Sequence, residues 1–171
     1  MQAVDLAPSA PISADIFRAA MRQFVGTVSL ITVGTGDERS GLVATSAGSL
    51  SADPPLVLVC VNRQASSWPL FARHAAFGVN FLRPHHRALA ERFSGRDGTT
   101  GSARYDGADW RTMVTGAPLL KDAAVAFDCE LDDMFDKGSH SVVIGRVMGV
   151  ATAEGEDALV YWRGGYRSLT A

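Results

Sequence analysis

The chain has 171 residues, 47% hydrophobic and 20% charged, which allows one substantial buried core and is not the composition of a disordered chain. Sixteen basic and eighteen acidic residues are mixed along the sequence and give a net charge of −2, which excludes the basic surface of a nucleic-acid binder and the cationic face of a membrane-bound helix. The sequence has no secretory-signal pattern, no apolar run of membrane-spanning length and no metal-type spacing of its two cysteines, so we expect a cytoplasmic protein.

The N-terminal part is predicted to be an arm followed by a helix. Residues 1–12 contain prolines and alanines without periodicity, so we expect a flexible arm there and a single domain over residues 13–171. Ser13 can cap a helix, and the apolar residues after it recur at helical spacing: Ile16, Phe17, Ala20, Met21 and Phe24. Gly26 is expected to end this amphipathic helix.

The next part of the chain has the composition of β-strands. Residues 27–33 are rich in β-branched side chains, residues 34–41 predict a polar turn, and residues 42–51 continue in small and polar side chains. After the break at Asp53-Pro54-Pro55, the run Leu56–Val61 is almost entirely apolar. This run predicts a strand that is buried on both faces.

The middle of the chain mixes short helices with one strand. Helices are predicted around Trp68–His74 and His85–Phe93, with a strand over Phe77–Leu82 between them. Residues 94–109 hold four glycines among polar residues and predict a long loop, a kind of segment that is often functional.

The last third is predicted to be strands. Apolar residues alternate with Asp128, Glu130 and Asp132, which predicts a half-buried strand with a solvated acidic face. Ser141–Val150 and Ala158–Trp162 complete a set of six or seven strands. So many strands in one domain of this size favour a mainly β fold, closed into a barrel with a few helices, because closure removes exposed strand edges.

Common catalytic and metal motifs are missing. Gly34, Gly36 and Gly41 do not match the dinucleotide-binding fingerprint, since the third glycine comes too late and no helix follows. The spacing of His85, His86 and Glu91 fits no common metal motif, and the acidic residues near 128–136 are better explained as a solvated face. We therefore expect no metal site.

Three stretches of the chain suggest a ligand site when they are taken together. Small hydroxyl residues crowd the segment from Gly41 to Pro55 and would let the backbone approach a flat ligand. Ser66 and Ser67 open a helix after a strand, beside Arg63, which is typical of a phosphate site. His140 follows a tight turn and precedes a long apolar strand. Each stretch alone also has an ordinary structural explanation.

With these stretches in this order along the chain, the sequence resembles the short-chain flavin reductase family, the reductase components of two-component flavin-dependent monooxygenases. The resemblance covers roughly residues 15–169 and rests on these segments: Phe24–Thr27, Ala44–Ala47, Asp53–Asn62, Phe77–Leu82, Gly116–Leu119, Gly138–Val147 and Gly164–Tyr166. The family often has serine where Ala47 and Ala65 stand here, and Gly138-Ser139-His140 replaces its Gly-Asp-His.

The resemblance implies an FMN-binding split barrel of Greek-key type, with the flavin at a homodimer interface. It implies that Ala44, Thr45, Ser46 and Ala47 bind the isoalloxazine ring of the cofactor and that Asn62 lies near the ribityl chain. Ser66, Ser67 and Trp68 would bind the phosphate, with Asn80 and Phe81 beside it. Arg92 and Phe93 would lie near the flavin or the partner's site, and Tyr166 would close the pocket. It places His140 at the reacting edge, where we expect a positioning rather than an essential role.

The implied reaction is hydride transfer from NADH or NADPH to FMN, with FAD possible, to supply reduced flavin to a partner monooxygenase. Two alternatives stay open. One is a flavoprotein reductase with tightly bound FMN that acts on a cobalt corrinoid or ferric iron. The other is a non-catalytic split-barrel protein that binds flavin or haem.

Overall fold

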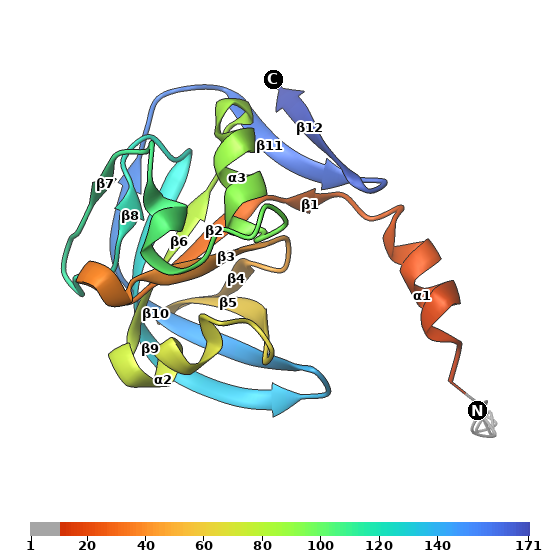
Figure 1. The fold of residues 1–171 in the computed structure, drawn as a ribbon, viewed down its shortest axis with the longest axis horizontal. Helices are drawn as coiled ribbons and strands as arrows, with labels where there is room; N and C mark the ends of the chain where they lie inside the picture. Colours follow the sequence, from red (N-terminus) through yellow and green to blue (C-terminus); the bar gives the residue numbers. More distant parts are fainter. Residues whose placement is uncertain (1–10) are drawn as a thin grey trace.

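The computed structural model describes residues 11–171, so residues 1–10 of the predicted arm lie outside the described part. The predicted N-terminal helix is present as α1 (Ala14–Met21), and the Ser13 side chain caps it by accepting a hydrogen bond from the N–H of Ile16 (3.3 Å). The helix ends at Met21, before the predicted end at Gly26, which is the first residue of β1. α1 stands away from the rest of the molecule, at the right of Figure 1, and none of its residues is buried. No described helix is long and apolar enough to cross a membrane.

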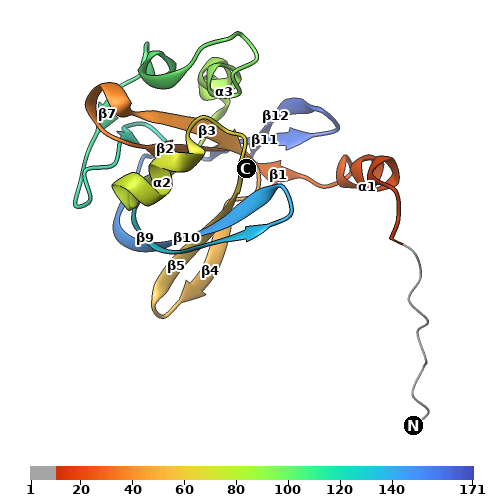
Figure 2. The same ribbon diagram turned by 60° about the horizontal axis from the view of Figure 1, so that its bottom comes forward.

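A seven-stranded antiparallel sheet forms the body of the molecule (Figures 1 and 2), in the order β3-β2-β6-β9-β10-β5-β4. Its strands are β2 (Ser29–Val33), β3 (Ser40–Ala44), β4 (Gly48–Ala52), β5 (Pro55–Asn62), β6 (Ala76–Phe81), β9 (Val125–Lys137) and β10 (His140–Thr152). β3 and β4 lie at opposite ends of this order, yet only residues 45–47 connect them. The sheet must therefore curve until its two edges meet, which makes the predicted closed barrel.

The strand order is that of a Greek-key sheet. β6 lies between β2 and β9, and β10 lies beside β5, so neighbours in space are joined by long connections of the chain. This topology brings the end of β5, the start of β10 and the β3–β4 connection to one side of the barrel.

Smaller elements surround the barrel. β1 (Gly26–Thr27), β11 (Asp157–Trp162) and β12 (Gly165–Thr170) form a three-stranded sheet, and β7 (Trp110–Arg111) pairs with β8 (Leu119–Leu120). The predicted short helices are α2 (Trp68–His74) and α3 (Arg87–Phe93), and three 3₁₀ turns lie at Gly36–Glu38, Pro84–His86 and Gly101–Tyr105.

Two apolar clusters occupy the two faces of the same strands. On β2, Ile31 and Val33 belong to the cluster with Val59 and Phe77, whereas Leu30 belongs to the cluster with Phe93 and other residues of the outer layer. The first cluster fills the barrel, and the second packs α3, the 101–105 turn and β8 against its outside. This division follows from the two-residue period of a strand.

The structure corrects three expectations about the strands. Leu56–Val61 is not buried on both faces, because only Val57, Val59 and Val61 are buried while the alternate residues are half-buried. Asp128 does not lie on a solvated face but is fully buried, since residues 115–118 cover that side of β9. β12 and the short strands β1, β7 and β8 were not predicted.

Candidate functional site

The connection between β3 and β4 joins the two edges of the barrel, and we call residues 45–47 the seam. The Ser46 hydroxyl accepts a hydrogen bond from the N–H of Cys60 (3.1 Å) and donates to the carbonyl of Cys60 (3.3 Å), which ties the seam to β5. Thr45 packs against β1 so closely that a Cβ added to Gly26 would lie 2.7 Å from the Thr45 Cβ. Small residues are therefore required where the seam meets its neighbours.

The turn between β5 and α2 leaves hydrogen-bond donors free. The Asn62 side chain accepts from the N–H of Gln64 (2.9 Å), and the Asn62 carbonyl accepts from the N–H of Ala65 (2.9 Å). Within residues 11–171, the N–H groups of Ser66 and Ser67 have no hydrogen-bond partner, and the buried Ser67 hydroxyl has none either. Buried polar groups are normally satisfied, so the Ser67 hydroxyl makes this turn a candidate site for a ligand with acceptor oxygens.

The hairpin that joins β9 and β10 supports this turn. The indole N–H of Trp68 donates to the Ser141 hydroxyl (2.8 Å), and Ser141 donates to Asp136 (2.6 Å). Asp136 also pairs with Arg63 (3.2 Å), whose guanidinium carbon lies 5.9 Å from the centre of the Trp68 ring. The network fixes Arg63 and Trp68 at the edge of a cavity of about 350 Å³.

His140 begins β10 directly opposite Asn62 in the antiparallel register. Its side chain is exposed, and the Ser139 hydroxyl lies 2.9 Å from its Nδ1 atom. The N–H of Arg63 donates to the carbonyl of Ser139 (3.0 Å), so the two turns are also joined through their backbones. An exposed imidazole therefore lies beside the free donors of the β5–α2 turn.

Tyr166 lies on β12 beside α3, with the guanidinium carbon of Arg87 6.0 Å from the centre of its ring. It pairs with Tyr161 across the β11–β12 hairpin, with ring centres 5.3 Å apart, and Tyr161 is opposite Gly26 on β1. Since Gly26 contacts Thr45, Tyr161 adjoins the seam, and Tyr161 and Thr45 line one cavity. Partial burial raises the pKa of Tyr166, so the phenol stays protonated at neutral pH and remains a hydrogen-bond donor.

The structure thus brings together most of the predicted residues: Ala44 at the end of β3, Thr45, Ser46 and Ala47 in the seam, Asn62, Ser66, Ser67 and Trp68 on the β5–α2 turn and His140 beside them, while Tyr166 lies on the β11–β12 hairpin beside α3. Together they form a strip along one side of the barrel.

Four predicted residues lie elsewhere. The buried Asn80 amide donates to the Leu30 carbonyl (3.1 Å) and accepts from the N–H of Leu120 (2.8 Å), so it fastens β8 to the barrel. Phe93 is 1% exposed within the outer apolar cluster. Phe81 packs edge-on against Phe127, with ring centres 6.2 Å apart. These side chains have structural roles in the isolated chain and are left out of the proposed site.

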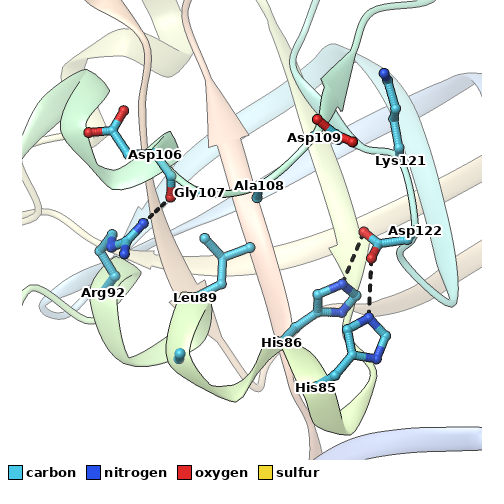
Figure 3. A pocket seen from close by; sticks show the side chains of 11 residues that line it. His85, His86, Leu89, Arg92, Asp106, Gly107, Ala108, Asp109, Lys121 and Asp122 are labelled. Atoms are coloured by element: carbon cyan, nitrogen blue, oxygen red, sulfur yellow. Dashed lines mark hydrogen bonds and ion pairs between the residues drawn. The ribbon is translucent and has the colours of Figure 1, made fainter.

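Arg92, the fourth, lines a different cavity of about 590 Å³ (Figure 3) and donates to the carbonyl of Asp106. The cavity also holds His85, His86 and Asp122, whose ligand atoms lie within 4.8 Å of one another. The His86 Nε2 atom is 3.0 Å from an Asp122 oxygen, and the His85 Nε2 atom is 3.2 Å from the other.

The contacts of the two histidines with Asp122 and with the backbone account for the histidine cluster. Burial lowers the pKa of His86, so its imidazole is neutral at pH 7, and its Nδ1 atom accepts from the N–H of Arg83 (3.1 Å). The ring proton is then on Nε2, and a protonated nitrogen cannot bind a metal. Burial raises the pKa of Asp122, but the hydrogen bonds and charges of His85 and His86 outweigh this and leave it lowered.

Asp136 and Ser141 were not among the predicted site residues. The sequence predicts a solvated face for Asp136 and the start of a strand at Ser141. The tight turn at Gly138 was the available signal, because it sets the register in which Asp136 and Ser141 face each other.

Comparison with known proteins finds relatives that match nearly the whole chain. The protein-family model described as "Flavin reductase like domain" matches residues 21–170. The FMN reductase (NADH) RutF 2 of Methylorubrum extorquens (strain PA1) is 40% identical over 158 residues, which cover 92% of this chain and 91% of that protein. The FMN reductase (NADH) RutF of Stutzerimonas stutzeri (strain A1501) is 36% identical over 163 residues, which cover 95% of this chain and 92% of that protein.

Solved structures agree with the observed fold. BorF, the flavin reductase component of a bacterial two-component tryptophan halogenase, superposes with a TM-score of 0.84 at 32% identity, covering 93% of this chain and 99% of that one. A nitrilotriacetate monooxygenase component B homolog from Mycobacterium thermoresistibile gives a TM-score of 0.82 at 30% identity, covering 91% of this chain and 86% of that one. The predicted split-barrel fold is confirmed by these structures.

Proposed function

Because this chain belongs to the flavin reductase-like family, we propose that it is an oxidoreductase that transfers hydride from NADH to FMN. NADH and FMN are preferred over NADPH and FAD because the relatives named above are FMN reductases that use NADH. The reduced flavin would serve a separate oxygenase component, as the names of the solved relatives suggest for those proteins.

One observation carries the proposal: among the residues that the structure describes, the β5–α2 turn offers three donors without a partner, including a buried hydroxyl, at one end of the strip. A flavin mononucleotide has a doubly charged phosphate at one end and a flat ring at the other. Ser66 and Ser67 would hold the phosphate with Arg63 adjacent, and Thr45, Ser46 and Ala47 would contact the ring through backbone groups. The residues present therefore fit the cofactor.

The bound flavin would supply a hydride acceptor, and the protein's task is to bind and orient the two nucleotides. The Ser66–Ser67 turn would fix one end of the flavin, and Tyr166 would cover the other with its apolar ring. His140 would donate or accept one hydrogen bond at the edge of the strip, where it could position a carboxamide. No proton transfer by a side chain is needed for hydride to pass between the rings.

We also propose that the active form is a cytoplasmic homodimer. The apolar side chains of α1 are unburied, with Ile16 61% and Phe17 54% exposed, and Phe24, which follows the helix, is 64% exposed, which favours a second chain as their cover. The thiols of Cys60 and Cys129 are both free, which supports a reducing compartment.

Steady-state oxidation of NADH in the presence of FMN tests the proposed function. We expect turnover with FMN, with lower kcat/KM for NADPH and for FAD. No turnover with either nucleotide and either flavin would refute the enzymatic proposal and favour a flavin- or haem-binding protein. A purified protein that is yellow and keeps its FMN on dialysis, and that reduces ferric iron or a corrinoid, would favour the bound-flavoprotein alternative.

A further inference from the structure

A cavity of about 340 Å³ lies beside the first residue of β3. Its walls are the turn before β3 with Arg39, strand β7 with Trp110 and Arg111, and the segment 112–118 that leads to β8. Arg39 directly precedes β3 and the seam directly follows it, so the five residues of that strand put about 17 Å between the two. In both views β7 lies on the side of the barrel away from α1 (Figures 1 and 2). The cavity is therefore separate from the proposed flavin site.

Two arginines line this cavity, and no acidic residue of the described chain does. Within residues 11–171, neither Arg39 nor Arg111 forms an ion pair. Glu38, which precedes Arg39, pairs instead with Arg73 (3.2 Å). Asp109, two residues before Arg111, lines the cavity of Figure 3 and not this one. The cavity is therefore electropositive.

Both guanidinium groups also contain a buried donor without a partner. The Nε atoms of Arg39 and Arg111 are buried, and neither has a hydrogen-bond partner in the described part of the chain. Buried polar groups are normally hydrogen-bonded, and a folded protein leaves few of them unsatisfied. Two such donors on the two arginines of one cavity indicate a site for a ligand with acceptor oxygens.

Aromatic side chains orient one wall of the cavity. The guanidinium carbon of Arg39 lies 4.8 Å from the centre of the Tyr105 ring, a cation–π contact that holds the group without neutralising it. Tyr105 is buried and packs against Trp110, with ring centres 4.6 Å apart, and the Trp110 indole N–H donates to the Tyr105 carbonyl (2.8 Å). Burial raises the pKa of Tyr105, so its phenol stays neutral. Trp110 itself is only half-buried, so a flat apolar surface lies next to two cations.

The opposite wall, segment 112–118, is fastened to the barrel. The N–H of Thr115 donates to the buried Asp128 carboxylate (2.9 Å), and the Thr32 hydroxyl donates to the Pro118 carbonyl. Between these two anchors, Gly116 has a φ angle of 84°, which glycine adopts without strain. The walls of the cavity are therefore held in place by hydrogen bonds to β2 and β9.

We propose that this cavity binds a small aromatic oxyanion, a molecule that carries a carboxylate or phosphate group on a flat ring. A guanidinium forms paired hydrogen bonds with either group, and two of them can together compensate its charge. The indole of Trp110 would stack on the ring. The volume is near the lower end of the range for small-molecule sites, which fits a single ring better than a dinucleotide. This inference does not depend on the proposed function, because no residue of the seam or of the β5–α2 turn lines the cavity.

Calorimetry with the full chain tests the proposal, with FMN present so that the β5–α2 turn is occupied. The probes are benzoate and phenyl phosphate. Acetate and inorganic phosphate lack the ring, and benzyl alcohol lacks the charge. At least one aromatic anion should bind more tightly than its ring-free counterpart, and the tighter of the two identifies the anionic group. No binding of either aromatic anion, or equal binding of benzyl alcohol, would overturn the proposal.

Arginine variants then locate the site. Arg39→Gln and Arg111→Gln each remove one charge and should weaken binding of the aromatic anion about tenfold. Arg39→Lys keeps the charge but loses the paired hydrogen bonds, so it should weaken binding less than Arg39→Gln does. Arg167→Gln, on β12 and outside the cavity, is the matched control and should change nothing. Circular dichroism confirms that each variant is folded.

Three outcomes would overturn the assignment. Equal weakening by Arg167→Gln and Arg39→Gln would mean that binding follows net charge alone. Cavity variants that bind the aromatic anion as the wild type does would place it elsewhere. If Arg39→Gln and Arg111→Gln dissociate a dimer in sedimentation and leave anion binding unchanged, the cavity is a contact between copies.

A last variant separates this inference from the proposed function. The double variant Ser66→Ala and Ser67→Ala should bind the aromatic anion as the wild type does, and loss of that binding would mean that the anion occupies the β5–α2 turn. A wild-type chain that binds benzoate or phenyl phosphate through Arg39 and Arg111 but oxidises no NADH would refute the reductase proposal and leave this assignment standing. Turnover of NADH without such binding would do the reverse.

Discussion

The imidazole of His140 is exposed, and the residue lies opposite Asn62, where the β5–α2 turn begins. It is held only by its neighbour Ser139, at 2.9 Å, and by the backbone register with Asn62. A side chain with so few contacts can form one hydrogen bond to a ligand but has no partner that would activate it as an acid or base.

We therefore predict that His140→Ala slows hydride transfer or raises the KM for NADH about tenfold, since one positioned hydrogen bond contributes about 0.5–1.5 kcal/mol. Flavin affinity should be nearly unchanged. Stopped-flow bleaching of the flavin by NADH measures the effect. Complete loss of reduction in a folded, flavin-binding variant would show an essential role, and no change at all would show that His140 is a solvated turn residue.

The sequence does not predict which buried polar side chains are hydrogen-bonded within the fold. Ser67 and Asn80 are both polar, buried residues in a β-rich segment, and the sequence does not distinguish them. In the structure, the Asn80 side chain has hydrogen-bond partners on two strands, β2 and β8, whereas within residues 11–171 the Ser67 hydroxyl has none. Which polar groups remain unsatisfied depends on distant segments such as β8, and no local pattern encodes that.

At the level of elements, the β5–α2 turn is the part of the proposed site that is best defined. Its hydrogen bonds are made by Asn62 and Ala65, which leaves the two serines free. The network through Asp136 and Trp68 holds Arg63 at its edge. A phosphate would meet backbone donors, a hydroxyl and a guanidinium together.

Replacing both Ser66 and Ser67 with alanine should weaken FMN binding at least tenfold, because hydrogen bonds to a charged group contribute about 1.5–3 kcal/mol each. Riboflavin, which lacks the phosphate, should lose little affinity. Fluorescence titration of the two ligands gives the comparison, and Ser168→Ala on β12 is a control serine variant away from the turn. Equal losses for FMN and riboflavin would contradict the phosphate assignment.

Elements with a strong local signal were predicted well. α2 matches its prediction residue for residue, and α1 begins at the predicted cap. β12 was missed because Gly165–Thr170 has no alternation and is a strand only through its pairing with β11. The burial of Asp128 was missed because Thr115, its hydrogen-bond donor, lies on a different segment. Tertiary contacts decided both cases.

At the level of the whole molecule, the apolar side chains of α1 have no packing partner within residues 11–171. A helix of eight residues is marginal by itself, and packing normally stabilises it. Here its apolar side chains face solvent, and it reaches well beyond the barrel in both views (Figures 1 and 2). A second copy is the cover that the family resemblance implies.

We predict that the flavin-bound protein sediments as a dimer at micromolar concentration. Ile16→Asp should shift it toward the monomer, because burying one such side chain contributes about 1.5–3 kcal/mol and a buried charge costs more. Arg18→Gln, on the same helix, is the control and should leave the dimer intact. A wild-type protein that sediments as a monomer would refute the dimer proposal.

The seam has a consequence for local stability. In the described sheet, β3 pairs with β2 and β4 pairs with β5, so no ladder of backbone bonds joins the two edges that residues 45–47 connect. Ser46 alone provides hydrogen bonds there, to Cys60. Native proteins open first where the fewest interactions are lost, so transient opening of the barrel should begin at this seam.

A ligand that lies along residues 45–47 and the end of β5 can bind only while the seam is closed. The bound flavin would then stabilise the closed barrel as well as react. Each tenfold rise of free flavin above its Kd would favour the closed form by about 1.4 kcal/mol. Opening of the barrel and release of the flavin would then be linked equilibria. Release of the reduced flavin would lower the stability of the closed barrel.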